Sequence, residues 1–231
     1  MIAAGHPKGE WLIGCEESGR VRDAMLALNI PAVSCDLLPS RSDRGEHLQM
    51  DLIEALRLRP WRGLIAFPTC TYLTCSAEWA YKDPDFTRYP DVGYHQRLQA
   101  GTLFGAKRRM ARQEAIQFAL LLWNCGLERV VIENPVGILS QHLGRPPTYQ
   151  PYEFGDDASK RTCFWFKGVR PLVPLPRWQW AAPRMVDGKP RWANQTDGGQ
   201  NKLSPGEDRA RDRSETFPGI ASALAEQIGR Q

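Results

Sequence analysis

The chain has 231 residues, of which 42% are hydrophobic and 24% charged, an ordinary balance for a globular protein. That length suffices for one α/β domain with a sizeable core. No apolar run approaches a membrane span, and residues 1–10 hold no apolar segment of signal-peptide length, so we expect a cytoplasmic protein with no membrane partner. The net charge of +4 permits a polyanionic partner without requiring one.

Along the first part of the chain, short apolar runs alternate with segments whose apolar residues are spaced as on one face of a helix. Strands are predicted over residues 11–15, 32–35, 64–67 and 129–132, and helices over 21–28, 52–58, 106–125 and 219–228. This alternation predicts an α/β fold with a mostly parallel, doubly wound sheet of the Rossmann-like type, flanked by helices. Two regions break the pattern: residues 71–105 form a long aromatic loop, and residues 171–213 form an irregular, exposed insert.

Six cysteines are scattered through the chain without metal-type clustering, and we expect no metal site. Without a secretory signal, all six are expected to be reduced thiols. Five are expected to be small buried hydrophobes and one to be reactive.

Polar clusters follow each of the four predicted strands. They are Glu16-Glu17-Ser18-Gly19, Asp36, Pro68-Thr69-Cys70 and Glu133-Asn134-Pro135. Because open α/β sheets bind ligands at the carboxyl ends of their strands, we expect these clusters to converge on one edge.

The first cluster is typical of a cofactor-binding turn. Gly19 would let the backbone approach a ligand, and Asp36 at the end of the next strand suits a ribose diol. Two acids would repel a pyrophosphate, which favours a cofactor without phosphates, such as S-adenosyl-L-methionine (SAM). The alternative is an ordinary strand–helix turn with solvated acids.

Cys70 and Glu133 are the candidate chemical groups. A thiol after a buried strand, on a proline-stiffened turn, is a nucleophile if nearby cations or amides lower its pKa. The alternatives are a structural cysteine, or Cys75 as the nucleophile. Burial would raise the pKa of Glu133 and let it hold a proton, although Asn134 and Pro135 are also typical of a helix start.

One reaction uses both groups. Carbon 5 of cytosine becomes nucleophilic when a thiolate adds at carbon 6 and ring nitrogen 3 is protonated. Carbon 5 can then accept a methyl group, after which a base removes its proton and the thiol leaves.

The ordered motifs resemble the cytosine-5 DNA methyltransferase superfamily, especially its short, phage-borne members, over nearly the whole chain. Residues 14–19 resemble the first SAM motif, with Cys15 in place of an aromatic residue and Glu17 in place of a glycine. The resemblance implies that SAM is held by Cys15, Glu16, Glu17, Ser18, Gly19, Asp36, Leu37, Asp51, Pro68 and Ser214.

The catalytic motifs follow in the same order. Pro68-Thr69-Cys70 resembles Pro-Pro-Cys, Glu133-Asn134-Pro135 resembles Glu-Asn-Val, and residues 159–165 resemble the Gln-x-Arg-x-Arg strand, where Ser159 and Cys163 replace the Gln and second Arg. The resemblance implies that Cys70, Glu133 and Arg161 are catalytic. It implies that the base is bound by Thr69, Asn134, Pro135 and Lys160, with Lys160 or Arg161 compensating for the missing Arg.

The expected protein is therefore a monomeric DNA (cytosine-5-)-methyltransferase acting on a flipped-out cytosine. Residues 1–168 would form the catalytic domain, 169–212 a small target-recognition insert, and 213–231 a segment returning to the catalytic domain. Residues 71–105 would be a mobile catalytic loop whose aromatic side chains stack on bases. Phosphates would contact a basic stretch, Lys107, Arg108, Arg109 and Arg112, and base edges would contact Asn194, Gln195, Gln200 and Asn201.

Three other functions stay open. One is an amino-methyltransferase, which the cysteine in place of an aromatic residue at position 70 disfavours. Another is an inactive DNA- or SAM-binding relative. The third is an enzyme that acts on another pyrimidine or transfers a modified one-carbon group.

Overall fold

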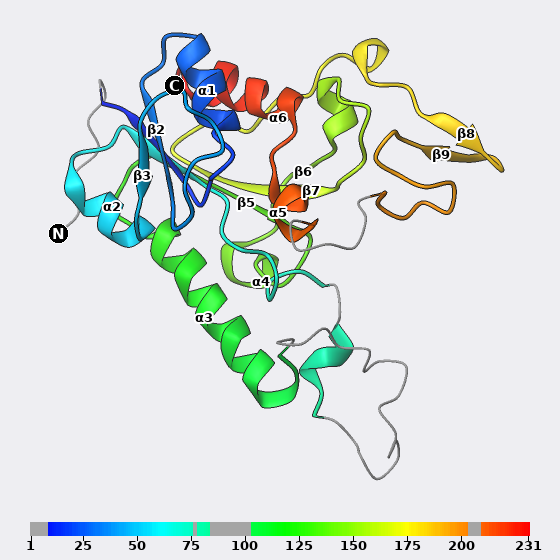
Figure 1. Ribbon diagram of the computed structural model, residues 1–231, viewed down its shortest axis with the longest axis horizontal. Coiled ribbons are helices and arrows are strands. Elements are labelled where there is room, and N and C mark those ends of the chain that lie inside the picture. The colour runs from blue at the N-terminus through cyan, green and yellow to red at the C-terminus, as the bar shows by residue number, and fades with distance from the viewer. Residues whose placement is uncertain (1–8, 76–77, 84–102, 203–208) are drawn as a thin grey trace.

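The computed structural model describes residues 9–75, 78–83, 103–202 and 209–231 (Figure 1). The strands are β1 (Trp11–Gly14), β2 (Ala32–Asp36), β3 (His47–Gln49), β4 (Gly63–Ala66), β5 (Val130–Pro135), β6 (Thr148–Tyr149), β7 (Thr162–Lys167), β8 (Arg184–Val186) and β9 (Lys189–Arg191). The α-helices are α1 (Arg20–Ala27), α2 (Leu52–Leu58), α3 (Gly105–Trp123), α4 (Ser140–Leu143), α5 (Arg209–Ser214) and α6 (Pro218–Ala223). Short 3₁₀ turns are η1 (Glu78–Tyr81), η3 (Pro151–Phe154) and η4 (Arg177–Gln179), and η5 (Leu224–Ile228) is a π-helical turn.

Seven strands form one sheet in the order β3-β2-β1-β4-β5-β7-β6. Strands β3, β2, β1, β4 and β5 are parallel, and β7 is antiparallel to both β5 and β6. The predicted mainly parallel α/β sheet flanked by helices is confirmed, and it is compatible with a Rossmann-like fold. Its order reverses between β1 and β4, which is the position where such sheets bind ligands.

The sheet is buried on both faces, as parallel strands require. Alternate residues of β1 show this, since Leu12 packs toward α2 and α3 while Trp11 and Ile13 pack toward α1 and α6. All three side chains are 0% exposed. In Figure 1, α1 and α6 lie together above the sheet and α3 runs away below it.

The secondary structure differs from the prediction in β5, in the C-terminal helix and in β3. Strand β5 continues past Glu133 to Pro135, because β7 pairs with it as far as Pro135 opposite Thr162. The helix start at Asn134 and Pro135 is therefore wrong. The predicted C-terminal helix is divided into α6 and the π turn η5. The short polar strand β3 was not predicted.

The expected irregular insert contains a β-hairpin. Strands β8 and β9 are joined at Asp187 (φ 49°) and Gly188 (φ 71°). Two positive φ angles are typical of the hairpin turns that favour Asp-Gly. The hairpin extends away from the seven-stranded sheet (Figure 1).

Among the described residues, no helix combines the length and apolar composition needed to cross a bilayer.

Candidate active site

The loop after β1 turns sharply at the sheet's ligand-binding edge. Its backbone is left-handed at Cys15 (φ 56°) and Gly19 (φ 74°). A Cβ on Gly19 would lie 2.5 Å from an Arg22 nitrogen and 2.8 Å from Ser42 Cβ, so glycine is required there. This turn buries the side chains of Glu16 and Glu17.

Glu16 is a buried carboxyl group with one oxygen unused. The Ser18 hydroxyl donates to Oε1, whereas Oε2 has no hydrogen-bond partner within the described residues. Burial raises the pKa of Glu16 to about 7, although Ser18 and the amides that open α1 act in the opposite direction. An unpaired buried oxygen is uncommon and suits a hydroxyl or cationic group of a ligand.

Three residues predicted to hold SAM, Asp36, Leu37 and Asp51, lie near this loop. The pKa of the Cys15 thiol is raised by burial and then by Asp36, Cys35 and Asp51, so these groups are close enough to interact. Leu37 is 70% exposed beside Asp36. Asp51 has a structural function that the sequence analysis missed, because its carboxylate caps α2 by accepting two backbone N–H bonds, at 2.8 and 3.3 Å.

The nucleophile motif is tied to β5 by a buried amide. Asn134 Nδ2 donates to the carbonyl oxygen of Pro68 at 2.8 Å, and the Asn134 side chain is almost wholly buried. Pro68 is buried, Thr69 is exposed and Cys70 is half-buried. This bond brings the end of β4 beside the end of β5, although 66 residues separate the two partners.

Cys70 is in electrostatic contact with three charged side chains. Burial raises the pKa of its thiol most, and Glu133 raises it further, whereas Lys160 and Arg213 lower it. The cations required for a nucleophilic thiolate are thus present. Because burial and Glu133 outweigh them, the protonated thiol is favoured in the free protein.

Glu133 is positioned to hold a proton. Burial raises the pKa of its carboxyl group, which Lys160 and a hydrogen bond from the Thr162 hydroxyl oppose. Thr162 sits on β7 and is buried. It is a site residue that the sequence analysis did not identify, because its position depends on the β5–β7 register.

Lys160 occupies the place expected of Arg161. Lys160 acts on both Cys70 and Glu133, and its Nζ donates to the Arg213 carbonyl oxygen at 2.7 Å. Arg161 is exposed, and its charge acts on Tyr152 and Cys163. The structure therefore brings Lys160, and not Arg161, to Cys70 and Glu133.

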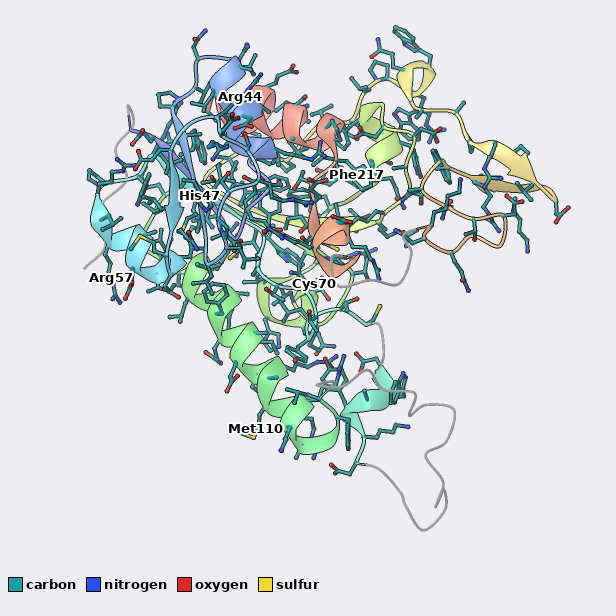
Figure 2. The ribbon with its side chains drawn as sticks, in the orientation of Figure 1. Arg44, His47, Arg57, Cys70, Met110 and Phe217 are labelled. Atoms are coloured by element: carbon teal, nitrogen blue, oxygen red, sulfur yellow. The ribbon has the colours of Figure 1, made fainter. Side chains whose placement is uncertain are left out.

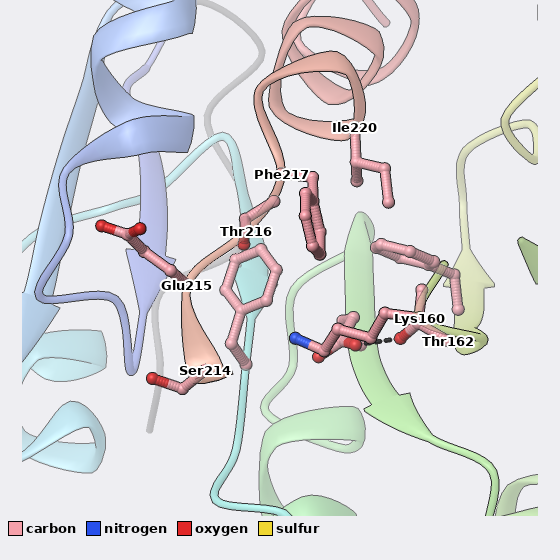
Figure 3. Close-up of a pocket in the computed structure, with 10 residues that line it drawn as sticks. Lys160, Thr162, Ser214, Glu215, Thr216, Phe217 and Ile220 are labelled. Atoms are coloured by element: carbon pink, nitrogen blue, oxygen red, sulfur yellow. Dashed lines mark hydrogen bonds between the residues drawn. The ribbon is translucent and has the colours of Figure 1, made fainter. Parts of the chain in front are cut away.

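A small hollow opens beside Glu133, with an empty volume of about 280 Å³ including its mouth (Figure 3). Lys160 and Thr162 lie on one side of it and Thr216 and Phe217 on the other. The lining residues are Phe67, Glu133, Lys160, Thr162, Phe164, Ser214, Glu215, Thr216, Phe217 and Ile220. The enclosed part of the hollow is only about 20 Å³, room for about one water molecule, so a bound base would lie mostly in its open mouth. We call it the Glu133 hollow.

Residues 209–217, which we call the C-terminal strap, connect this hollow to the loop after β1. Arg211 Nε bonds both Glu17 oxygens, at 2.7 and 2.8 Å, and Glu215 pairs with Arg20 at 2.8 Å. Ser214 lines the hollow, with its hydroxyl donating to the Arg211 carbonyl oxygen. The predicted cofactor and base residues thus share one continuous edge.

Several predicted nucleic-acid contacts have protein partners instead. Arg109 and Arg112 bind backbone carbonyl groups and acids, and the buried Arg108 binds carbonyl groups. Asn194 bonds the N–H and the C=O of Ser159, both at 3.0 Å, so its amide is not available to read a base.

Other predictions about this region have mixed outcomes. Tyr72 and Tyr81 pack around Arg108, whereas Phe86, Tyr89 and Tyr94 lie outside the described residues. Cys75 is exposed rather than buried.

Comparison with models of protein families and with curated proteins found no match. Within the described ranges, no group of three or more His, Cys, Asp or Glu side chains is placed to hold a metal ion.

Proposed function

We propose that this protein transfers a methyl group from SAM to carbon 5 of a cytosine in DNA. The observation that carries this proposal is the joint placement of Cys70, Glu133 and Lys160. The thiol and the carboxyl group interact with each other and with one cation, and the carboxyl group lines a small hollow that opens to solvent. This is the set of groups that a pyrimidine needs for activation at carbon 5.

Each group has a separate task in the proposed mechanism. Cys70 loses its proton to solvent water and the thiolate sulfur adds to carbon 6 of the ring, while Glu133 gives its proton to ring nitrogen 3. The raised pKa of Glu133 suits a group that must start protonated. As carbon 5 gains the methyl group, S-adenosylhomocysteine would leave. Water would then remove the carbon-5 proton, the C5–C6 double bond would re-form as the C–S bond breaks, and the sulfur would leave as a thiolate. Ring nitrogen 3 would return its proton to Glu133, and the thiolate would regain a proton from water. Lys160 would stabilise the negative charge on sulfur before attack and after release.

The loop after β1 fits the polar groups of SAM. The unpaired Glu16 oxygen suits its ammonium or sulfonium charge, Asp36 suits its ribose hydroxyls, and the exposed Leu37 suits an apolar contact with adenine. When bound, SAM would supply the methyl group as a carbon already activated by the adjacent sulfonium.

The insert supplies a surface for DNA. Within the insert, residues 177–202 contain five Lys or Arg and two Asp and so carry a net charge of +3, whereas the net charge of the whole chain is +4. Trp178 is 81% exposed, and a two-stranded ribbon such as β8–β9 is narrow enough for the major groove. Trp192 stacks on Tyr152, with ring centroids 4.4 Å apart, which fixes the insert to the catalytic domain.

Transfer of labelled methyl groups tests the proposal. The protein is incubated with methyl-labelled SAM and duplex or single-stranded DNA, and the digested nucleosides are analysed by mass spectrometry. We expect 5-methylcytosine with wild-type protein and with Cys75→Ser, and none with Cys70→Ser. Label on an exocyclic nitrogen, or 5-methylcytosine at the wild-type level from Cys70→Ser, would overturn it.

A further inference from the structure

The turn that carries Cys70 is fixed at its own carbonyl group. The Cys70 oxygen accepts from the backbone N–H groups of Leu73, at 3.0 Å, and Thr74, at 3.1 Å. Leu73 is fully buried, so the turn is anchored in the core. We call residues 70–75 the Cys70 turn.

One side of the Cys70 turn rests on the loop after β5. Ile138 N donates to the Leu73 oxygen at 2.8 Å, and Cys75 N donates to the Val136 oxygen at 3.3 Å. A Cβ on Gly137 would lie 1.9 Å from the Leu73 oxygen, so the two backbones are in the closest contact that glycine allows. The segment that carries Glu133 therefore also fixes the turn that carries Cys70.

The other side is held by side chains from α3 and η1. The Tyr72 carbonyl oxygen, two residues after Cys70, accepts from Arg112 Nε at 3.0 Å and from the Tyr81 hydroxyl at 2.8 Å. Arg108 lies within 3.5 Å of the Thr71 oxygen and bonds the Leu103 oxygen at 3.1 Å.

The Arg112 guanidinium is itself restrained. It lies 3.3 Å from the centre of the Tyr81 ring and 2.6 Å from a Glu78 oxygen, and its side chain is only 14% exposed. A guanidinium stacked on a ring and paired with a carboxylate has few other orientations open to it. It is therefore committed to the protein rather than to a phosphate.

We propose that Arg112 is a positioning residue for Cys70, and that it sets the direction of the thiol by holding the Tyr72 carbonyl group. The inference rests on the proposed function only in taking Cys70 as the nucleophile. Loss of Arg112 would loosen one side of the turn, where the Tyr81 hydroxyl and Arg108 remain, while Asn134 and the Gly137 contact still hold the other. The thiol would become more exposed and less well aimed.

Two opposite readouts test the role. Alkylation of Cys70 by iodoacetamide is followed by peptide mass spectrometry, with the same variant unfolded in urea as the reference for full reactivity. Because release from burial lets the pKa of the thiol fall, we expect alkylation in Arg112→Ala to be about threefold faster or more. Methyl transfer should fall by about tenfold or more in kcat with little change in KM for DNA, since misplacement by about 1 Å affects the reacting atoms rather than binding.

Matched variants separate positioning from general damage. Arg57→Ala removes an exposed arginine on α2, outside this network, and should behave as wild type in both assays. Tyr81→Phe removes a single hydrogen bond to Tyr72, and Arg112→Lys keeps one donor. Both variants should therefore have Cys70 alkylation rates and kcat values between those of wild type and those expected for Arg112→Ala. They keep the test available if Arg112→Ala does not fold. The buried cysteines Cys35, Cys125 and Cys163 should stay unreactive in every folded variant.

The outcomes distinguish the two proposals. Faster Cys70 alkylation in a protein that methylates nothing would support the positioning role and remove the proposed function. Unchanged Cys70 alkylation in folded Arg112→Ala, Arg112→Lys and Tyr81→Phe would overturn the positioning role, whatever the methyl-transfer activity.

Discussion

Replacing Glu16 with glutamine should make the protein more stable and a poorer cofactor binder. Glutamine keeps the shape of the side chain and an acceptor for Ser18, but it removes the ionisable group from a buried site. The pKa of Glu16 rises from an ordinary 4.5 to about 7. Since one pKa unit corresponds to roughly 1.36 kcal/mol, ionisation of Glu16 costs the folded state on the order of 3 kcal/mol.

The sign of the pH dependence follows from which state holds the proton more tightly. Between pH 4.5 and about 7 the folded protein retains a proton that the unfolded chain has released, so the free energy of unfolding falls as pH rises. The Glu16→Gln variant does not show this fall. Its stability advantage should grow from below about 1 kcal/mol at pH 5 to about 3 kcal/mol at pH 8.5.

Urea denaturation of both proteins at the two pH values measures the effect, and calorimetric titration with SAM measures binding. Loss of a charge-assisted hydrogen bond should weaken SAM binding by about tenfold or more at pH 8.5. A variant that is less stable than wild type at pH 8.5, or an advantage that does not change with pH, would refute the reasoning. Either result would mean that the Glu16 carboxyl group is exposed to solvent or has a polar partner in the folded protein.

Three further predictions concern other parts of the molecule. Lys160→Met should slow alkylation of Cys70 at pH 8, because Lys160 lowers the pKa of the thiol; a faster rate in this variant would contradict the assigned charge. Gly137→Ala should lower the free energy of unfolding by about 1–3 kcal/mol in urea, because its Cβ meets the Leu73 carbonyl group, whereas Gly198→Ala, where the nearest atom is 3.8 Å away, should change it by less than about 0.5 kcal/mol. Replacing Lys189 and Lys202 of the insert with alanine should reduce the slope of log K for DNA binding against log salt by about one for each phosphate that is no longer neutralised. Arg57→Ala on α2, far from the hairpin in Figure 2, should leave the slope unchanged, and an equal effect at both sites would count against the insert.

Much of the fold follows from periodicity along the chain. The strands β1, β2, β4 and most of β5 are short apolar runs, and α2 shows helical spacing, so local pattern suffices to find them. Strand β3 (His-Leu-Gln) carries no such pattern and is a strand only because it pairs with β2. The β8–β9 hairpin had a usable local signal, the Asp187-Gly188 pair, which the irregular composition around it obscured.

The site is harder to predict because pairing register decides it. Arg161 and Lys160 are adjacent in the chain, and only the structure shows that Lys160 acts on Cys70 and Glu133. The basic stretch at the start of α3 has the composition of a phosphate site, yet Arg108 is buried between Tyr72 and Tyr81. Sequence composition records the charge of these side chains but not their partners.

Covalent trapping on DNA that contains 5-fluorocytosine tests the central claim most directly. Fluorine at carbon 5 leaves no proton to remove, so the C–S bond formed at carbon 6 cannot break after methyl transfer. With SAM present, we predict a stable protein–DNA adduct whose modified peptide contains Cys70, retained in Cys75→Ser and abolished in Cys70→Ser. An adduct that persists in Cys70→Ser, or the absence of any adduct with wild-type protein, would contradict the account.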